Sequence, residues 1–269
     1  MADTYPARAH LIAGGFPPGS MGGHDQDYAR LRLLELLAER DIPASVGNDF
    51  ADIEKWLPVS RLLITYVAGP YPNADQTRAI GQWLEAGGRW LGLHGTSGGR
   101  AERVEGMRMR RSIKTEHHAL LGSRFLTHPP IREFRVEVTK PDSPLTRGLG
   151  SSFVIEDEPY FIELQDPAST QILLTADYGP SAASATEGLY PSDTSLQPDG
   201  RARVIGYTRE IGKGGVTYVA LGHCHNPAIR AGRPADPADK TPPSFRGPWE
   251  NDAFVTLLRN GIAWGMQTG

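Results

Sequence analysis

Several histidines of this chain stand where predicted strands end. His24 follows the first predicted strand, His94 ends the fourth, and His223 and His225 follow the last. Open parallel sheets bind their ligands at the carboxyl ends of the strands, so we expect these imidazoles to share one site. An imidazole acts as a base, an acid or a metal ligand near neutral pH. The sequence therefore predicts proton transfer or metal chemistry at this edge.

His94 occupies a sharp strand exit within residues 88–99, which read GRWLGLHGTSGG. In related α/β architectures such a turn carries a nucleophilic Cys or Ser. An imidazole there is a poor permanent nucleophile and a good proton carrier. We therefore do not expect acyl-enzyme chemistry.

An acidic run, Glu156-Asp157-Glu158, precedes Pro159 and Tyr160 inside an otherwise apolar segment. Exposed acidic runs are commonly only solvated. The apolar flanks predict instead that at least one carboxylate is partly buried, which would raise its pKa toward values useful for acid–base catalysis.

The triplet His223-Cys224-His225 allows two interpretations. If the strand continues, alternation places both imidazoles on one face, where they could chelate one metal ion. If it ends at Gly222, only His223 points into the site, and we favour this second interpretation slightly. The lone Cys224 is more typical of a small core residue than of a nucleophile.

Composition sets the class of protein. The chain has 269 residues, a formal net charge of −3 and one cysteine, which favours a soluble protein of a reducing cytoplasm with no nucleic-acid or membrane partner. No signal peptide or membrane span is expected. Residues 14–19, GGFPPG, lack the spacing of a dinucleotide fingerprint, so we expect no nucleotide cofactor.

Strands and helices alternate in the first half, which predicts a parallel sheet with right-handed crossovers. The expected strands are residues 10–13, 42–46, 61–67 and 89–93, and the expected helices are 28–40 and 75–86. The second half is expected to hold strands at 133–139, 153–164, 171–175, 204–209 and 215–221, a final helix at 250–266, and long loops at 179–200 and 226–248. The arginine-rich residues 100–111 are expected on a solvated helix face. We find no interdomain linker and predict one domain over residues 1–269.

Together these segments resemble the trehalose-utilisation (ThuA-like) family of the class I glutamine amidotransferase-like superfamily. The matching segments are residues 87–94, 120–129, 143–149, 157–160, 212–218, 221–223 and the closing helix through Trp264. The resemblance implies a flavodoxin-like three-layer α/β/α fold, mostly parallel with antiparallel additions in the C-terminal half, in which His94 takes the place of the amidotransferase cysteine. It also implies a role in carbohydrate catabolism, beside dehydrogenases that oxidise a sugar hydroxyl to a ketone.

The leading hypothesis is therefore an enzyme, a hydrolase or lyase that cleaves a 3-keto glycoside of a small carbohydrate by acid–base chemistry. The expected catalytic residues are His94, Glu158, Tyr160 and His223, with His94 or Glu158 as the base. The expected substrate-binding residues are His24, His128, Asp157 and His225. A divalent metal would be held by His24, His223 and Glu158. The rival hypotheses are a non-catalytic sugar- or partner-binding domain and, less favoured, amidase chemistry through Cys224; a homo-oligomer is a further expectation.

Overall fold

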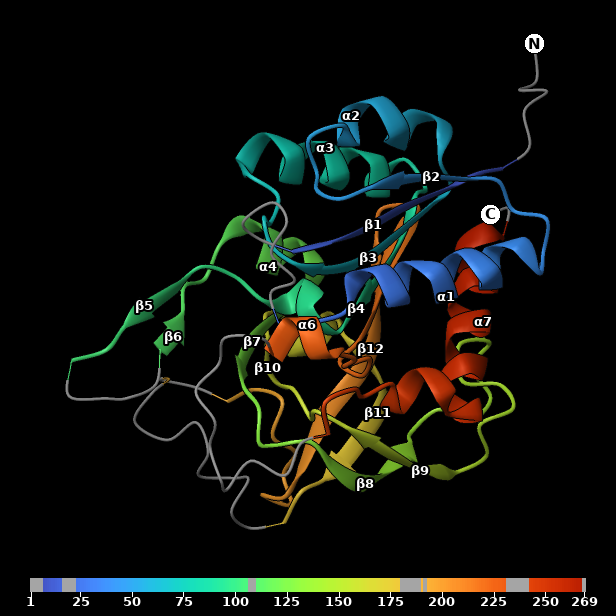
Figure 1. Cartoon of the computed structure of the whole chain (residues 1–269). Helices are drawn as coiled ribbons and strands as arrows, with labels where there is room; N and C mark the ends of the chain where they lie inside the picture. The colour runs from blue at the N-terminus through green and yellow to red at the C-terminus, as the bar shows by residue number, and fades with distance from the viewer. Residues whose placement is uncertain are drawn as a thin grey trace.

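A computed structural model describes residues 7–15, 23–105, 110–179, 190, 193–230 and 242–267 of the chain. Its main feature is a nine-stranded sheet in the order β2-β1-β3-β4-β13-β12-β11-β8-β9 (Figure 1). The first five strands in this order pair in parallel, and they are β2 (Ala44–Gly47), β1 (Ala9–Gly15), β3 (Leu62–Ala68), β4 (Arg89–Leu93) and β13 (Gly214–Val219). Their order is that of flavodoxin-like sheets.

The central strands are apolar because helices cover both faces of the sheet. Helices α1 (Gln26–Ala38) and α7 (Asp252–Met266) pack on one face, and α3 (Ala74–Glu85) packs on the other beside α2 (Ile53–Trp56) and α4 (Glu116–Leu121) (Figure 1). The three-layer, flavodoxin-like fold is thus confirmed. One domain over residues 1–269 stays a prediction.

Four antiparallel strands extend the sheet, as expected for the C-terminal half. They are β12 (Ala202–Ile211), β11 (Gln171–Asp177), β8 (Arg132–Val138) and β9 (Ser152–Asp157). The β12–β13 hairpin turns at Gly212, whose φ of +57° favours glycine. A Cβ there would also lie 2.1 Å from the Glu85 carboxylate. The extension places the end of β9 near the parallel strand ends.

Two segments differ from expectation. The strand predicted over 153–164 is broken after Asp157, and its second half forms β10 (Phe161–Leu164), which pairs with the unexpected β7 (Ser123–Thr127) in a separate sheet. The arginine-rich segment is not helical: β5 (Ala101–Arg103) and β6 (Arg110–Ser112) pair as antiparallel strands. Glu102 and Arg111, which lie opposite each other on the two strands, form a salt bridge of 2.5 Å.

The predicted loops are only partly visible, since residues 180–189, 191–192 and 231–241 lie outside the described residues. Between them, a short helix α6 (Pro227–Arg230) follows the His223 segment.

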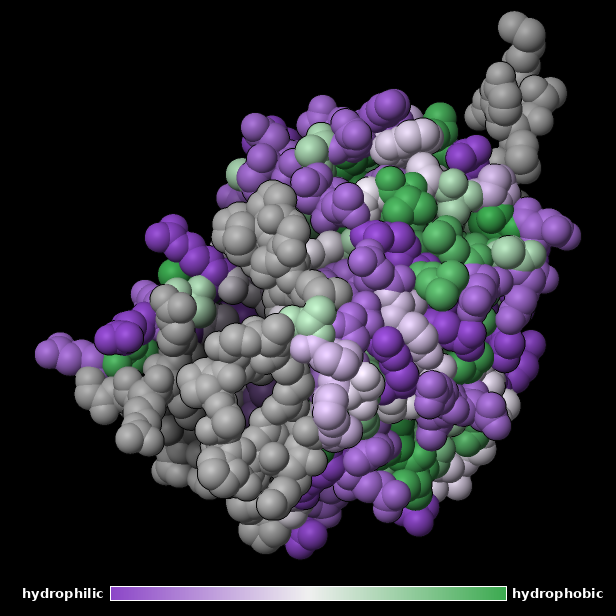
Figure 2. Space-filling model, viewed as in Figure 1, coloured by the Kyte–Doolittle hydropathy of each residue, from purple (hydrophilic) through white to green (hydrophobic). Residues whose placement is uncertain are grey.

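Hydrophobic residues on the face shown in Figure 2 form small patches separated by polar residues. Among the described residues, the exposed large hydrophobic side chains are Leu31, Val46, Val59 and Val154. Within the same residues, no helix is long and apolar enough to cross a membrane. A homo-oligomer stays a prediction.

Candidate active site

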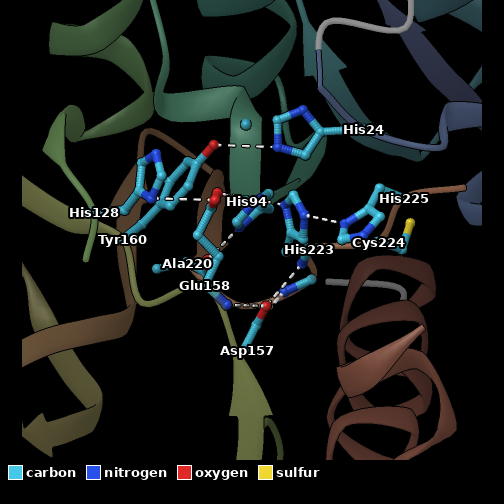
Figure 3. Close-up of polar contacts among 12 residues, drawn as sticks. His24, His94, His128, Asp157, Glu158, Tyr160, Ala220, His223, Cys224 and His225 are labelled. Carbon is cyan, nitrogen blue, oxygen red and sulfur yellow. Dashed lines mark hydrogen bonds and ion pairs between the residues drawn. The ribbon is translucent and has the colours of Figure 1, made fainter. Parts of the chain in front are cut away.

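Four side chains converge at the carboxyl ends of the strands: His24, His94, Glu158 and His223 (Figure 3). One ligand atom from each lies within 4.8 Å of the others. His24 precedes α1, His94 directly follows β4, Glu158 directly follows β9, and His223 lies shortly after β13. We call these four residues the histidine–glutamate cluster.

His94 sits on the turn that the sequence predicted, with a φ of +41° that is unusual for a residue other than glycine. Its side chain is fully buried, and its Nδ1 lies 2.8 Å from the carbonyl oxygen of Ala220. The Tyr218 hydroxyl donates to the His94 carbonyl at 2.7 Å. At the next residue, a Cβ on Gly95 would lie 2.4 Å from the Val67 carbonyl oxygen, so the turn requires glycine there. These contacts fix the direction of the imidazole.

The contact with Ala220 also determines which His94 nitrogen carries the proton. A carbonyl oxygen only accepts hydrogen bonds, so Nδ1 must donate. In the neutral ring, Nε2 is then an unprotonated acceptor. Burial lowers the pKa of His94, while the neighbouring Glu158 opposes that fall. His94 therefore presents an unprotonated nitrogen to the cluster.

His223 is held by a short chain of hydrogen bonds. Its Nε2 lies 2.9 Å from Nδ1 of His225, and Nε2 of His225 lies 2.8 Å from the carbonyl oxygen of Pro242. Because that carbonyl only accepts, His225 donates to it from Nε2, and its Nδ1 accepts the proton of His223 Nε2. The remaining nitrogen of neutral His223, Nδ1, is an acceptor that faces Glu158 (Figure 3).

Asp157 anchors the turn that carries His223. Its carboxylate accepts backbone N–H bonds from Glu158 at 2.7 Å, Gly222 at 2.7 Å and His223 at 3.0 Å. Burial raises the pKa of Asp157 to about 7, and these N–H donors limit the rise. Asp157 thus joins the end of β9 to the turn after β13.

Glu158 turns its two carboxylate oxygens in different directions. Oε2 lies 3.4 Å from Nδ1 of His223 and 3.7 Å from Nε2 of His94. Oε1 lies 3.1 Å from Nδ1 of His128, whose side chain is 42% exposed, against 14% for Glu158. Burial opposes ionisation, but hydrogen bonds from the proton-donating forms of His223 and His94, together with the charge of His223, outweigh it and hold the pKa of Glu158 well below its usual range. The rise in pKa that was expected for at least one carboxylate of this run is found at Asp157, whereas the pKa of Glu158 is lowered.

Tyr160 closes the cluster on the side of His24. Its hydroxyl lies 3.3 Å from Nε2 of His24, and its ring centroid lies 3.8 Å from that of His94. Burial raises the pKa of Tyr160 well above its usual value, and the nearby Glu158 charge adds to the rise. The phenol is therefore protonated at neutral pH.

The segment of His24 is tied to that of His223 through the backbone. The N–H of Asp25 donates to the Cys224 carbonyl at 2.8 Å. The Asp25 carboxylate caps α1 at Tyr28 N–H and pairs with Arg246 at 2.6 Å. Burial raises the pKa of the Cys224 thiol to about 12. Cys224 is thus a buried packing residue between the two segments.

The structure brings together most of the predicted site residues. His24, His94, Glu158 and His223 form the cluster, while Tyr160 and His128 lie against it. His225 lies behind His223 and Asp157 lies beneath the turn, so their direct contact with substrate stays a prediction. Strand β13 ends at Val219, before the triplet, so strand alternation does not govern the two imidazoles.

Sequence reasoning missed the residues that hold the turn after β13. The Tyr66 hydroxyl and the Trp249 indole N–H both donate to the Gly222 carbonyl, at 2.9 Å and 2.8 Å. An aromatic residue with a polar tip inside an apolar strand was the available signal for Tyr66. The membership of His94 among the candidate metal ligands was missed as well.

Comparison with known proteins identifies the family. The sequence matches the family model ThuA, described as trehalose utilisation, over residues 20–230. The chain belongs to the ThuA family. This family membership places the protein in carbohydrate metabolism. No curated protein matches the sequence.

Solved structures share the fold of this chain. A ThuA-like protein of Bacteroides uniformis ATCC 8492 matches with a TM-score of 0.63 and 18% identity, covering 97% of this chain and 92% of that one. A ThuA-like protein of Parabacteroides merdae ATCC 43184 matches with a TM-score of 0.60 and 15% identity, covering 98% and 91%. A β-galactosidase of Rahnella sp. R3 matches with a TM-score of 0.52 and 14% identity, covering 81% of this chain and 29% of that one. At these identities the likeness concerns the fold alone.

Proposed function

We propose that this ThuA-family protein is an enzyme of carbohydrate catabolism, a hydrolase or lyase that cleaves 3-keto glycosides by acid–base chemistry. The observation that carries the proposal is the orientation of Glu158. One of its oxygens faces the exposed His128, and the other faces two buried imidazole nitrogens. An ionised carboxylate with one oxygen beside an exposed side chain suits a base that removes a proton from carbon.

The ketone makes this chemistry accessible. A carbonyl at C3 acidifies the proton on C2, and removal of that proton leaves an enolate. The enolate re-forms the ketone as a C1–C2 double bond forms and the C1–O bond breaks, and the departing oxygen takes up a proton. Water then adds at C1 in the hydrolase, or the unsaturated sugar leaves in the lyase. This route does not use the two opposed carboxylates of an ordinary glycosidase.

Burial favours Glu158 over His94 as the base, the two candidates that the sequence proposed. His94 is fully buried and directs its Nε2 at Glu158, so substrate cannot approach it without displacing the carboxylate. Glu158 is partly exposed beside His128. We therefore assign Glu158 as the base. We assign His128 as a substrate contact that can pass the proton taken up by Glu158 to solvent. General acid–base assistance typically contributes about 10²- to 10⁴-fold in rate.

Tyr160 is assigned as the acid for the departing oxygen. Its raised pKa keeps the phenol protonated at neutral pH, and its hydroxyl lies on the cluster side near His24. His24 is assigned to the enolate oxygen, where negative charge develops. His223, whose Nδ1 is an acceptor, would stabilise that oxygen only through a bound cation. A cytoplasmic setting fits the single cysteine, which is free and buried.

A paired substrate panel tests the proposal. Each 3-keto-glucoside or 3-keto-disaccharide is incubated beside its unoxidised parent, and release of the sugar is followed by chromatography. We expect release from the keto compounds only. Equal release from both members of a pair would overturn the elimination route. Binding of the keto compounds without release would instead support the sugar-binding domain.

A further inference from the structure

The histidine–glutamate cluster contains buried acceptor atoms that face one another without a hydrogen-bond donor. Nε2 of His94 and Nδ1 of His223 are both buried and have no hydrogen-bond partner. Each lies within 3.7 Å of Oε2 of Glu158, which is itself an acceptor when ionised. Buried acceptors without donors are costly, so a cation is expected among them.

The spacing of these atoms suits a metal ion better than a proton. A charge-assisted N–H···O bond to a carboxylate is about 2.7–2.9 Å long, whereas the two N···O distances here are 3.4 Å and 3.7 Å. Nitrogen and oxygen ligands of a tetrahedral ion lie about 2.0–2.2 Å from it, and hence roughly 3.3–3.5 Å from each other. The cluster therefore leaves room for an ion at its centre.

The second nitrogen of each imidazole is bound as it is in metal sites. A metal-bound histidine typically donates its other N–H to a carbonyl, a carboxylate or a comparable acceptor, which fixes the tautomer. His94 does so to the Ala220 carbonyl, and His223 does so to His225, which is fixed in turn by the Pro242 carbonyl. Both lone pairs are thereby aimed at the centre of the cluster.

We propose that the histidine–glutamate cluster binds one divalent transition-metal ion through Nε2 of His94, Nδ1 of His223, a ring nitrogen of His24 and Oε2 of Glu158. Three imidazoles and one carboxylate favour ions such as Zn²⁺ or Co²⁺ over Mg²⁺ and Ca²⁺, which prefer oxygen ligands. The ion would stabilise negative charge on the enolate oxygen, and only this consequence rests on the proposed function. Oε1 of Glu158 remains available beside His128.

Metal binding is tested on the full chain without any turnover. The protein is purified without chelator for elemental analysis, and a stripped sample is titrated with Co²⁺ and Zn²⁺ by absorbance and calorimetry. We expect one ion per chain and a Co²⁺ spectrum of nitrogen and oxygen ligands. Sub-stoichiometric metal together with no saturable Co²⁺ or Zn²⁺ binding would overturn the proposal, and the cluster would then hold a proton.

Variants distinguish the proposed metal ligands from residues that only lie beside them. We expect His223→Gln and Glu158→Gln to weaken metal binding by more than the roughly 10- to 100-fold that is typical for loss of an outer partner. His128→Gln, at the exposed oxygen of Glu158, should keep the affinity. Unchanged affinity in both ligand variants would contradict the assignment.

His225, which accepts the hydrogen bond from Nε2 of His223, provides a test of positioning. His225→Phe keeps the stacking on Phe245 but removes the acceptor for His223, and we expect a loss of roughly 10- to 100-fold in Co²⁺ affinity. His225→Gln restores an acceptor and a donor, and should recover part of this loss. Equal Co²⁺ affinity in the two His225 variants would show that the hydrogen bond to His225 does not position His223 for the metal. A metal-bound protein that releases no sugar would refute the proposed function alone, and an active protein that binds no metal would refute only the metal site.

Discussion

Nδ1 of His223 lies 3.4 Å from Oε2 of Glu158, and neither atom carries a proton when the imidazole is neutral and the carboxylate is ionised. His223 lies on the turn after β13 and Glu158 lies at the end of β9, two segments that are far apart in the sequence. Asp157 holds the same two segments together from beneath, through backbone N–H groups on both. The geometry of the site therefore depends on the junction between the parallel and antiparallel halves of the fold.

Loss of the Glu158 carboxylate should abolish most of the activity. We expect Glu158→Gln to lower kcat for a 3-keto glycoside by about 10²- to 10⁴-fold, because an amide cannot remove the C2 proton. The matched control is Glu156→Gln in the same acidic run, where the side chain is exposed and activity should be unchanged. Steady-state kinetics on both variants make the comparison, and equal rates would rule out Glu158 as the base.

The acid role of Tyr160 predicts a dependence on the leaving group. Tyr160→Phe should slow release of an alkyl or sugar alcohol by about 10²-fold or more, because that oxygen needs a proton to depart. A nitrophenyl leaving group departs without one, so its release should be nearly unaffected. Tyr178→Phe is the control, since that buried hydroxyl has no hydrogen-bond partner. Equal slowing of both classes of substrate would argue against an acid at this position.

Asp157 should contribute to stability through its backbone hydrogen bonds. In Asp157→Asn the amide oxygen can keep the bonds to Glu158 and His223, but the amide nitrogen then faces the Gly222 N–H, donor against donor. We expect a loss of about 1–3 kcal/mol in the free energy of unfolding, measured by urea denaturation. Asp142→Asn, at an exposed position, should change it little. A variant as stable as the wild type would show that the three bonds are dispensable.

The buried histidines outside the cluster predict loss of stability in acid. Burial lowers the pKa of His10 and of His118 to about 4 each, from 6.5. Below pH 6.5 the unfolded chain therefore binds protons that the folded chain does not, until the pH falls to about 4. The free energy of unfolding should thus fall as the pH drops through this window. Urea midpoints across it measure the slope, and His10→Asn should flatten it; a slope of zero in the wild type would contradict the prediction.

The buried thiol of Cys224 should take no part in catalysis. Its pKa is raised to about 12 by burial, so almost no thiolate forms at neutral pH and the nucleophilic form is missing. We expect iodoacetamide to leave the folded protein active and to label Cys224 only after denaturation, as followed by mass spectrometry. Loss of activity in proportion to labelling of the folded protein would instead support amidase chemistry through Cys224.

The layers of the fold could be predicted because their signals are local. Apolar runs such as Leu62–Ala68 and the alternation of Arg132–Val138 fix the strands and their faces. The hairpin of the arginine-rich segment could not be predicted, because charged residues pair across strands as readily as along a helix. The break between Asp157 and Phe161 depends on β10 leaving the main sheet to pair with β7.

The residues that meet at the site could be predicted from the sequence, but the pKa shifts within it could not. Strand ends brought His24, His94 and His223 to one edge, as the topology requires. The direction of the Glu158 pKa could not be predicted, because it depends on which imidazole nitrogens face the carboxylate. Those nitrogens are fixed by the carbonyl groups of Ala220 and Pro242. The positions of backbone carbonyls cannot be read from the types of residue in a sequence.

Proton removal from C2 is the central claim, and exchange with solvent measures it directly. A 3-keto sugar is incubated with the protein in D₂O, and loss of the C2 proton signal is followed by NMR beside an enzyme-free sample. The account predicts rapid exchange with the wild type and with Glu156→Gln, and exchange at the enzyme-free rate with Glu158→Gln. Enzyme-free rates in all samples, from protein that still releases the sugar, would contradict it.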